Sequence, residues 1–168
     1  MSELRIRPGR EDDWESVRSL RNEMLRDSPR RFSERLDNAL ALDESAWKTK
    51  IRRSHNANST SLVAIENGQD WIGTMGARIR GSDADTELVS AYVCPASRGR
   101  DKGVADQLLE AVAAWTTDRG GNLRLWVHQD NDRAHGFYQR RGYQATGRTQ
   151  PHNLNPEYHE LEMMRRLE

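Results

Sequence analysis

Hydrophobic positions along the chain change their spacing, and each change predicts a different element. After a short extended run at residues 4–8, apolar residues recur at helical spacing over residues 11–28 and 31–53, with a break near Asp43. Three extended runs follow at residues 61–66, 71–80 and 86–94. The first two flank Asn67-Gly68, a strong hairpin signal. The first half therefore predicts one strand, two helical regions and three further strands.

The second half returns to alternating helices and strands. One face of residues 104–115 is apolar at helical spacing, and residues 123–127 alternate as a strand. Asn131 is placed to cap a helix that runs to Arg141 and stops at Gly142, before strands at 143–148 and 159–167. This order predicts an α/β fold of the α+β kind, with helices packed on a mixed sheet. Without repeats or a linker, residues 1–168 are expected to form one domain.

Composition narrows the possible classes of protein. Twenty-six basic residues balance twenty-six acidic ones, so the chain lacks the positive excess typical of nucleic-acid binders. The start of the chain lacks a signal-like apolar run, and no run is long enough to span a membrane, so we expect a cytoplasmic protein. A single cysteine, Cys94, and five histidines without metal-site spacing predict that no metal is bound.

The segment from Arg98 to Ala105 is the first candidate for chemistry. It joins a predicted strand to a helix N-terminus, where unpaired backbone N–H groups and the helix dipole favour an anion. Gly103 and Ala105 leave room for a pyrophosphate to approach the backbone. A solvated turn rich in arginine and glycine fits the composition equally well, and the dinucleotide-binding pattern GxGxxG is absent from the sequence.

Two motif blocks resemble those of the GCN5-related N-acetyltransferase (GNAT) family. The first is Tyr92-Val93-x-Pro95 followed by Arg100-x-x-Gly103-x-Ala105, and the second comprises Asn131, Ala134, Phe137-Tyr138 and Arg141-Gly142-Tyr143. The element order is also similar, so the resemblance covers essentially the whole chain and implies a central, mostly antiparallel sheet flanked by helices. Pro95 and Arg100 lie five positions apart, where the family usually has three, which indicates two extra residues in the loop.

The resemblance implies that acetyl-CoA is bound as a co-substrate. Backbone groups of Ala91, Tyr92 and Val93 would hold its pantetheine arm and thioester. The remaining binding residues that the resemblance implies are Arg98, Arg100, Asp101, Lys102, Gly103, Val104, Ala105, Asn131 and Tyr138. Asn131 is equally well explained as a helix cap, and Tyr138 as a core aromatic residue.

The implied reaction is transfer of an acetyl group to a primary amine by direct attack in a ternary complex. Tyr138 matches the family's general acid. For the general base, Glu87 is the best carboxylate, with His128 or a chain of waters as rivals, because Trp126 stands where some relatives have a glutamate. Cys94 is interpreted as a small buried residue rather than a nucleophile, since direct transfer needs no covalent step.

Several alternatives stay open at the level of sequence. The acceptor is a small-molecule or peptide amine, and the first two helices and the connection over residues 150–158 would select it. A non-catalytic acyl-CoA-binding module that senses or regulates is the alternative to an enzyme. Neither a nucleic-acid nor a membrane partner is expected, and whether the chain forms a homodimer is left open.

Overall fold

The computed structural model describes residues 3–29, 32, 34–79, 85–119 and 121–167, and its elements follow the predicted order. Within these residues the sheet comprises β1 (Leu4–Pro8), β2 (Ser59–Glu66), β3 (Asp70–Ile79), β4 (Thr86–Val93), β5 (Asn122–His128), β6 (Gln144–Pro151) and β7 (His159–Arg166). The helices are α1 (Trp14–Asp27), α2 (Leu36–Leu40), α3 (Glu44–Arg53), α4 (Val104–Thr117) and α5 (Asp132–Gln139). The predicted element ends at Arg31 and Arg80 lie outside the described residues.

The helix boundaries follow from local capping. The second helical region divides into α2 and α3, as predicted, because Asp43 is extended and its carboxylate accepts a hydrogen bond from the Ala46 N–H at 2.8 Å. Helix α5 ends two residues earlier than predicted. The Tyr143 N–H turns back to the Tyr138 carbonyl at 3.1 Å, and Gly142 takes the left-handed conformation that ends the helix.

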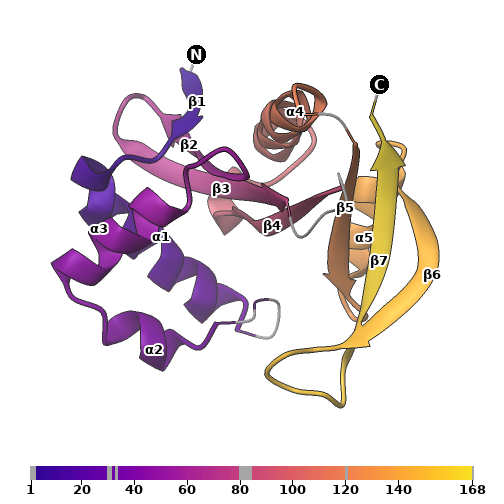
Figure 1. The fold of residues 1–168 in the computed structure, drawn as a ribbon. Helices are drawn as coiled ribbons and strands as arrows, with labels where there is room; N and C mark the ends of the chain where they lie inside the picture. The colour runs from indigo at the N-terminus through magenta and orange to yellow at the C-terminus, as the bar shows by residue number, and fades with distance from the viewer. Residues whose placement is uncertain (1–2, 30–31, 33, 80–84, 120, 168) are drawn as a thin grey trace.

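The strands form one mixed sheet in the order β1-β2-β3-β4-β5-β7-β6 (Figure 1). β4 and β5 are parallel, and every other neighbouring pair is antiparallel, which confirms the mostly antiparallel sheet. Asn67 and Gly68 both have positive φ in the tight turn between β2 and β3, so the predicted hairpin is confirmed. The last strand, β7, lies between β5 and β6.

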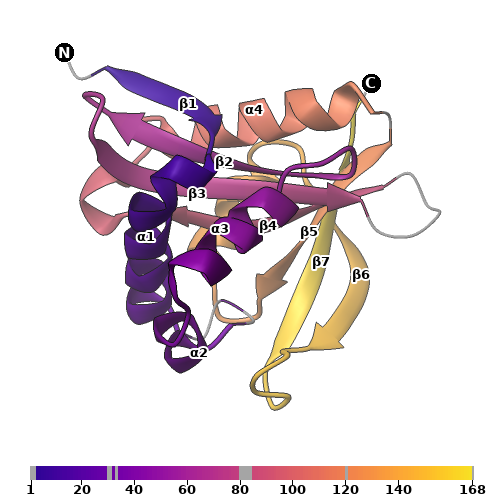
Figure 2. The same ribbon diagram turned by 60° about the vertical axis from the view of Figure 1, so that its left-hand side comes forward.

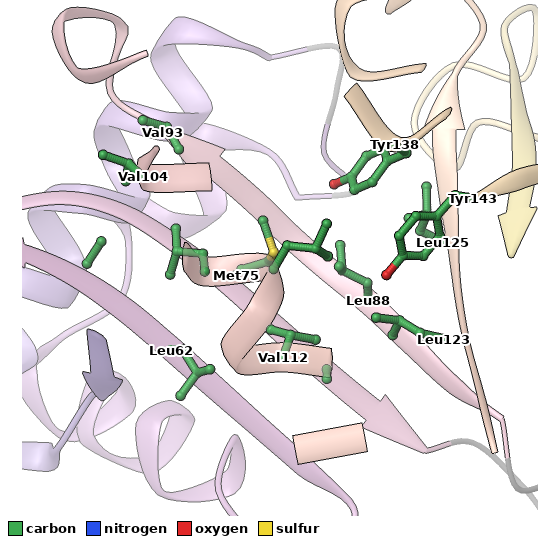
Figure 3. Close-up of a cluster of buried hydrophobic side chains, with 14 of the residues drawn as sticks. Leu62, Met75, Leu88, Val93, Val104, Val112, Leu123, Leu125, Tyr138 and Tyr143 are labelled. Carbon is green, nitrogen blue, oxygen red and sulfur yellow. The ribbon is translucent and has the colours of Figure 1, made fainter. Parts of the chain in front are cut away.

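Helices cover both faces of the sheet. α1 packs on one face of the sheet, α2 and α3 pack against α1, and α4 lies on the other face (Figures 1 and 2). The main core lies under α4, where Leu108 and Val112 are fully buried. Figure 3 shows Val112 together with strand residues of the same cluster, among them Met75 and Leu123. Among the described residues no helix combines the length and apolar character required to cross a membrane.

Gly73 permits the close approach of α4 to β3. A Cβ added at this position would lie 3.0 Å from the Tyr92 carbonyl oxygen and 3.2 Å from a Leu108 methyl group. Both distances are tighter than ordinary van der Waals contact, so a larger residue would push α4 and β4 away from β3. Gly73 thereby fixes the position of α4, the helix whose N-terminus faces the site described next.

Candidate active site

The site begins where β4 and β5 separate. The two strands pair only at Thr86 with Leu123 and Glu87 with Arg124, and beyond these pairs they diverge. Figure 1 shows β2, β3 and β4 running across the view, while β5, β7 and β6 turn away from them. A cleft of about 980 Å³ opens between the two groups of strands. From Leu88 onward, the backbone groups of β4 on the β5 side therefore face this cleft rather than a neighbouring strand.

A β-bulge at Ser90 re-orients the end of β4. Ser90 has φ +56°, a conformation that costs a residue other than glycine about 1–3 kcal/mol, and the pairing with β3 shifts register at this point. Because of the bulge, Leu88 and Val93 belong to the same buried cluster, although strict alternation would place them on opposite faces. The bulge thus sets which backbone groups of Ala91 to Val93 face the cleft.

The loop after β4 leads directly into α4. Gly103 is the N-cap of α4 with φ +66°, and an added Cβ would meet nothing within 4 Å, so the backbone here is approachable. The first N–H groups of the helix point out of its N-terminus without an intrahelical acceptor. The side chain of Val104 is buried in the core, so it does not reach the cleft. These features make the end of the cleft suitable for an anion.

The predicted cationic residues of the loop have different roles. Arg98 donates to the Val93 carbonyl and to Asp27, and the Lys102 ammonium donates to the Ala96 carbonyl within the loop. Arg100 is exposed and lines the cleft. Partial desolvation, together with the charges of Arg100 and Arg141, lowers the pKa of Arg140. The loop before α4 and the end of α5 therefore both bring positive charge to this part of the cleft.

Helix α5 places Tyr138 against the cleft. Asn131 caps the helix, since its side-chain oxygen accepts a hydrogen bond from the Ala134 N–H at 3.1 Å. Tyr138 lines the cleft while most of its ring is buried, and burial raises the pKa of its hydroxyl. In Figure 3 its oxygen points away from Tyr143 and toward the side of Val93 and Val104. At neutral pH this hydroxyl is protonated and able to donate.

Glu87 lines the cleft where β4 and β5 begin to separate, and it is itself the last residue of β4 that pairs with β5. Its carboxylate faces the Arg78 guanidinium at 3.5 Å, and its side chain is mostly buried. Across the sheet its backbone pairs with Arg124 on β5, so two basic residues flank it in the strand register. The carboxylate of Glu87 is therefore held between basic residues at the edge of the cleft, and a carboxylate is a side chain that can act as a general base.

His128, the rival candidate for the base, also lines the cleft. It is buried at the end of β5, and its Nδ1 accepts the Asp130 N–H at 3.1 Å. In a neutral ring the proton therefore sits on Nε2, so the basic lone pair of Nδ1 is already engaged. The ring also packs edge-on against His152 at 5.6 Å. Within the described residues no group of three or more His, Cys, Asp or Glu is placed to hold a metal ion.

The opposite wall of the cleft comes from α1 and the segment that links it to α2, and from the end of β6 and the segment that follows it. Phe32, Glu34 and Arg21 line it on one side, and Gln150, Pro151 and Asn153 line it on the other. Burial alone would raise the pKa of Glu34, but the hydrogen bond from Lys50 and the charge of Arg21 outweigh it and lower this pKa. The wall therefore carries fixed, paired charges.

Comparison with known proteins decides the family. A model of the acetyltransferase (GNAT) family matches residues 14–143, more than three quarters of the chain. The chain belongs to the GNAT acetyltransferase family. An uncharacterized N-acetyltransferase of Mycobacterium bovis is 41% identical over 71 residues, which cover 41% of this chain and 44% of that protein, so the match spans less than half of the relative.

Solved structures show the same fold. A GNAT-family acetyltransferase from Streptococcus pneumoniae superimposes with a TM-score of 0.81 at 20% identity, covering 97% of this chain and 98% of that one. The PaiA N-acetyltransferase from Thermoplasma acidophilum, solved in complex with coenzyme A, superimposes with a TM-score of 0.70 at 19% identity, covering 95% and 98%. At these identities the likeness establishes the GNAT fold.

In this GNAT chain, most of the predicted site residues line the one cleft. They are Glu87, Ala91, Tyr92, Val93, Arg98, Arg100, Ala105, Asn131 and Tyr138. Asp101, Lys102, Gly103 and Val104 lie in the adjoining loop and first helical turn. Sequence reasoning missed Ser90, Arg21 and Arg140. For Ser90, the one available signal was a polar residue in the middle of β4, at the point where buried and less buried side chains stop alternating.

Proposed function

We propose that this chain transfers an acetyl group from acetyl-CoA to a primary amine, by direct attack of the amine in a ternary complex. The observation that carries the proposal is the open edge of β4, which ends beside the N-terminus of α4 in one continuous cleft. An extended arm fits the strand edge and a pyrophosphate fits the helix end. Membership of the GNAT family and the coenzyme A complex of the PaiA relative support this assignment.

Each part of the cleft has a proposed role toward acetyl-CoA. Backbone groups of Ala91, Tyr92 and Val93 hold the pantetheine arm and orient the thioester carbonyl. The helix N-terminus at Gly103 to Ala105 binds the pyrophosphate, and Arg100 adds positive charge at its rim. Acetyl-CoA supplies the activated acetyl group, and fixed N–H donors directed at its carbonyl oxygen stabilise developing negative charge.

Two side chains are proposed to move protons. Tyr138 protonates the departing thiolate from its position on α5, since burial keeps its hydroxyl protonated at neutral pH. Glu87, directly or through water, accepts the proton of the attacking amine. The Nδ1 contact of His128 argues against that residue as the base.

The environment of Cys94 supports direct transfer. Burial first, and then a hydrogen bond with Glu23, raises the pKa of its thiol to about 12. A neutral, half-buried thiol is a poor nucleophile, so a covalent acyl-enzyme on this residue is disfavoured. The amine is therefore proposed to attack the thioester itself.

One observation favours the second candidate, a non-catalytic acyl-CoA-binding module. Trp126 lines the cleft at the position where some relatives have a catalytic glutamate. The two functions are separated by measuring binding and turnover on the same preparation. We expect acetyl-CoA to raise the Tm in a concentration-dependent way, and a panel of small amines and peptides to include one that releases free CoA. Binding without release across the panel would favour the sensor.

A further inference from the structure

Arg98, in the loop that follows β4, contacts both the end of β4 and the end of α1. Its Nε donates to the Val93 carbonyl at 2.8 Å, one Nη donates to the Asp27 carboxylate at 2.7 Å, and its guanidinium lies 5.5 Å from the centre of the Tyr92 ring. We propose that Arg98 is a positioning residue that fixes the end of β4 against α1, and not a ligand of the acetyl-CoA phosphates. The inference rests on the proposed acetyltransferase function.

The contacts of Arg98 leave its guanidinium little freedom. The guanidinium is a planar fork, so two bonds to groups on different segments fix both its position and its plane. The bond to Val93 satisfies a carbonyl at the strand end, and the bond to Asp27 is charge-assisted. A phosphate that took the same Nη donor would have to displace the Asp27 carboxylate.

The location of Asp27 supports the same conclusion. It is the last residue of α1, where the helix dipole disfavours a negative charge. The pKa of Asp27 is nevertheless lowered, first by the hydrogen bond from Arg98, against a partial desolvation that would raise it. The Tyr92 side chain contributes a weaker effect in the same direction. The Arg98 guanidinium thus offsets the unfavourable effect of the helix end on the Asp27 carboxylate.

The length of the loop explains how Arg98 becomes available for this contact. Arg98 follows Pro95 by three positions, and Arg100 lies two positions further along the chain. Helix α4 begins after Gly103, so the Arg100-x-x-Gly103 spacing meets the helix N-terminus and Arg98 lies before it. Arg100 is exposed at the cleft, whereas Arg98 turns toward α1.

A second contact completes the attachment of α1 to β4. The Arg21 guanidinium on α1 donates to the Ser90 hydroxyl at 3.2 Å, at the bulge itself. Arg21 and Asp27 therefore hold the acceptor-side helix at two points along the strand that carries the donor site. Loss of the contact between Arg98 and Asp27 is expected to let the acetyl group and the amine shift relative to each other. A misplacement of about 1 Å can reduce turnover by about a hundredfold.

The test compares two acetyl donors that differ in their phosphates. Arg98→Ala, Asp27→Asn and the double variant are assayed with acetyl-CoA and with S-acetyl-pantetheine, a thioester without pyrophosphate or nucleotide. We expect each single variant to lower kcat about ten- to a hundredfold, by the same factor with both donors, and to leave the KM for acetyl-CoA within about twofold. Because the residues share one contact, the double variant should be no worse than Arg98→Ala.

Arg100→Ala provides the contrasting pattern. It should weaken acetyl-CoA binding and spare S-acetyl-pantetheine turnover, since its charge is directed at phosphate.

Arg98→Lys keeps the positive charge but replaces the planar guanidinium with a single ammonium group, so we expect its kcat to stay low. Full recovery of kcat in Arg98→Lys would contradict the inference. A defect of Arg98→Ala confined to acetyl-CoA would also overturn it. If Arg98→Ala fails to fold by circular dichroism, Asp27→Asn alone reports the same contact. Failure of the proposed function is distinct, because wild type would then turn over neither donor.

Discussion

The rings of Tyr138 and Tyr143 meet edge to face, with their centroids 5.6 Å apart. The two hydroxyls have different surroundings. Tyr138 lines the cleft, whereas the Tyr143 hydroxyl is buried and makes no hydrogen bond to any described residue (Figure 3). Burial raises the pKa of both, that of Tyr143 to about 12, so both are protonated at neutral pH. The pair therefore offers a site residue and a matched neighbour of the same type.

Tyr138→Phe removes the proposed proton donor and keeps the ring. We expect kcat to fall at least tenfold with acetyl-CoA binding little changed, the low end for general acid catalysis, which is worth about 10²–10⁴-fold. A thiol with a pKa near ~8.5 is a tolerable leaving group without protonation. Steady-state kinetics with a good acceptor measure the effect. Tyr143→Phe is the control and should keep full kcat; an unchanged kcat in Tyr138→Phe would reduce Tyr138 to a core aromatic.

Gly103→Glu places bulk and negative charge at the N-terminus of α4. It should abolish the rise in Tm produced by acetyl-CoA, because the carboxylate occupies the region proposed for the pyrophosphate. The positive φ of Gly103 adds a strain of about 1–2 kcal/mol that is independent of the ligand.

Gly68→Glu controls for strain and charge together. Gly68 also has positive φ with open space around its Cα, and it lies in the β2–β3 hairpin, away from the cleft. The Gly68 variant should lose similar stability and keep the full acetyl-CoA shift. A normal shift in Gly103→Glu would remove this helix end from the binding site.

Glu87→Gln tests the proposed base. The substitution keeps the shape of the side chain and removes its negative charge, so we expect kcat/KM to fall and the acidic limb of its pH profile to move. Glu66→Gln, at the end of β2, is the control for loss of a strand-end carboxylate and should leave the profile in place. An unaltered profile in Glu87→Gln would leave proton removal to solvent.

Cys94 should react slowly with iodoacetamide in the native protein. Its thiol pKa of about 12 means that the thiolate is a very small fraction at pH 8, and that the alkylation rate rises about tenfold per pH unit while the fold persists. Because Cys94 is the single cysteine, the same sample unfolded in urea gives the reference rate. Cys94→Ala should keep turnover; loss of activity, or rapid alkylation at pH 7, would contradict the noncovalent scheme.

Local signals account for much of the architecture that was predicted. Asn67-Gly68, Asp43, Asn131 and Gly142 act through their own backbone conformations and immediate neighbours, so each could be assigned from sequence alone. The predicted start of the second helical region at Arg31 and the predicted strand end at Arg80 lie outside the described residues, and α5 ended early because a turn formed beyond Gln139. Such local devices depend on a few adjacent residues and are readable without knowing what packs against them.

The cleft depended on longer-range geometry. The motif residues identified the loop and Tyr138, yet the distances that bring them together arise from the divergence of β4 and β5 and from the packing of α4 over Gly73. The bulge at Ser90 decided which side chains of β4 point to each face of the sheet. No local preference favours a serine at positive φ. The surrounding sheet imposes that conformation.

The sequence by itself determined the order of the elements, their caps and turns, and the two motif blocks that identify the family. Only the tertiary structure decided the use of each charged residue. Arg98 and Arg100 are two positions apart and chemically identical, and both line the cleft, but Arg98 is paired with Asp27 whereas Arg100 is exposed. Partner choice depends on which segments the fold brings within hydrogen-bonding distance, and Asp27 lies 71 residues away along the chain.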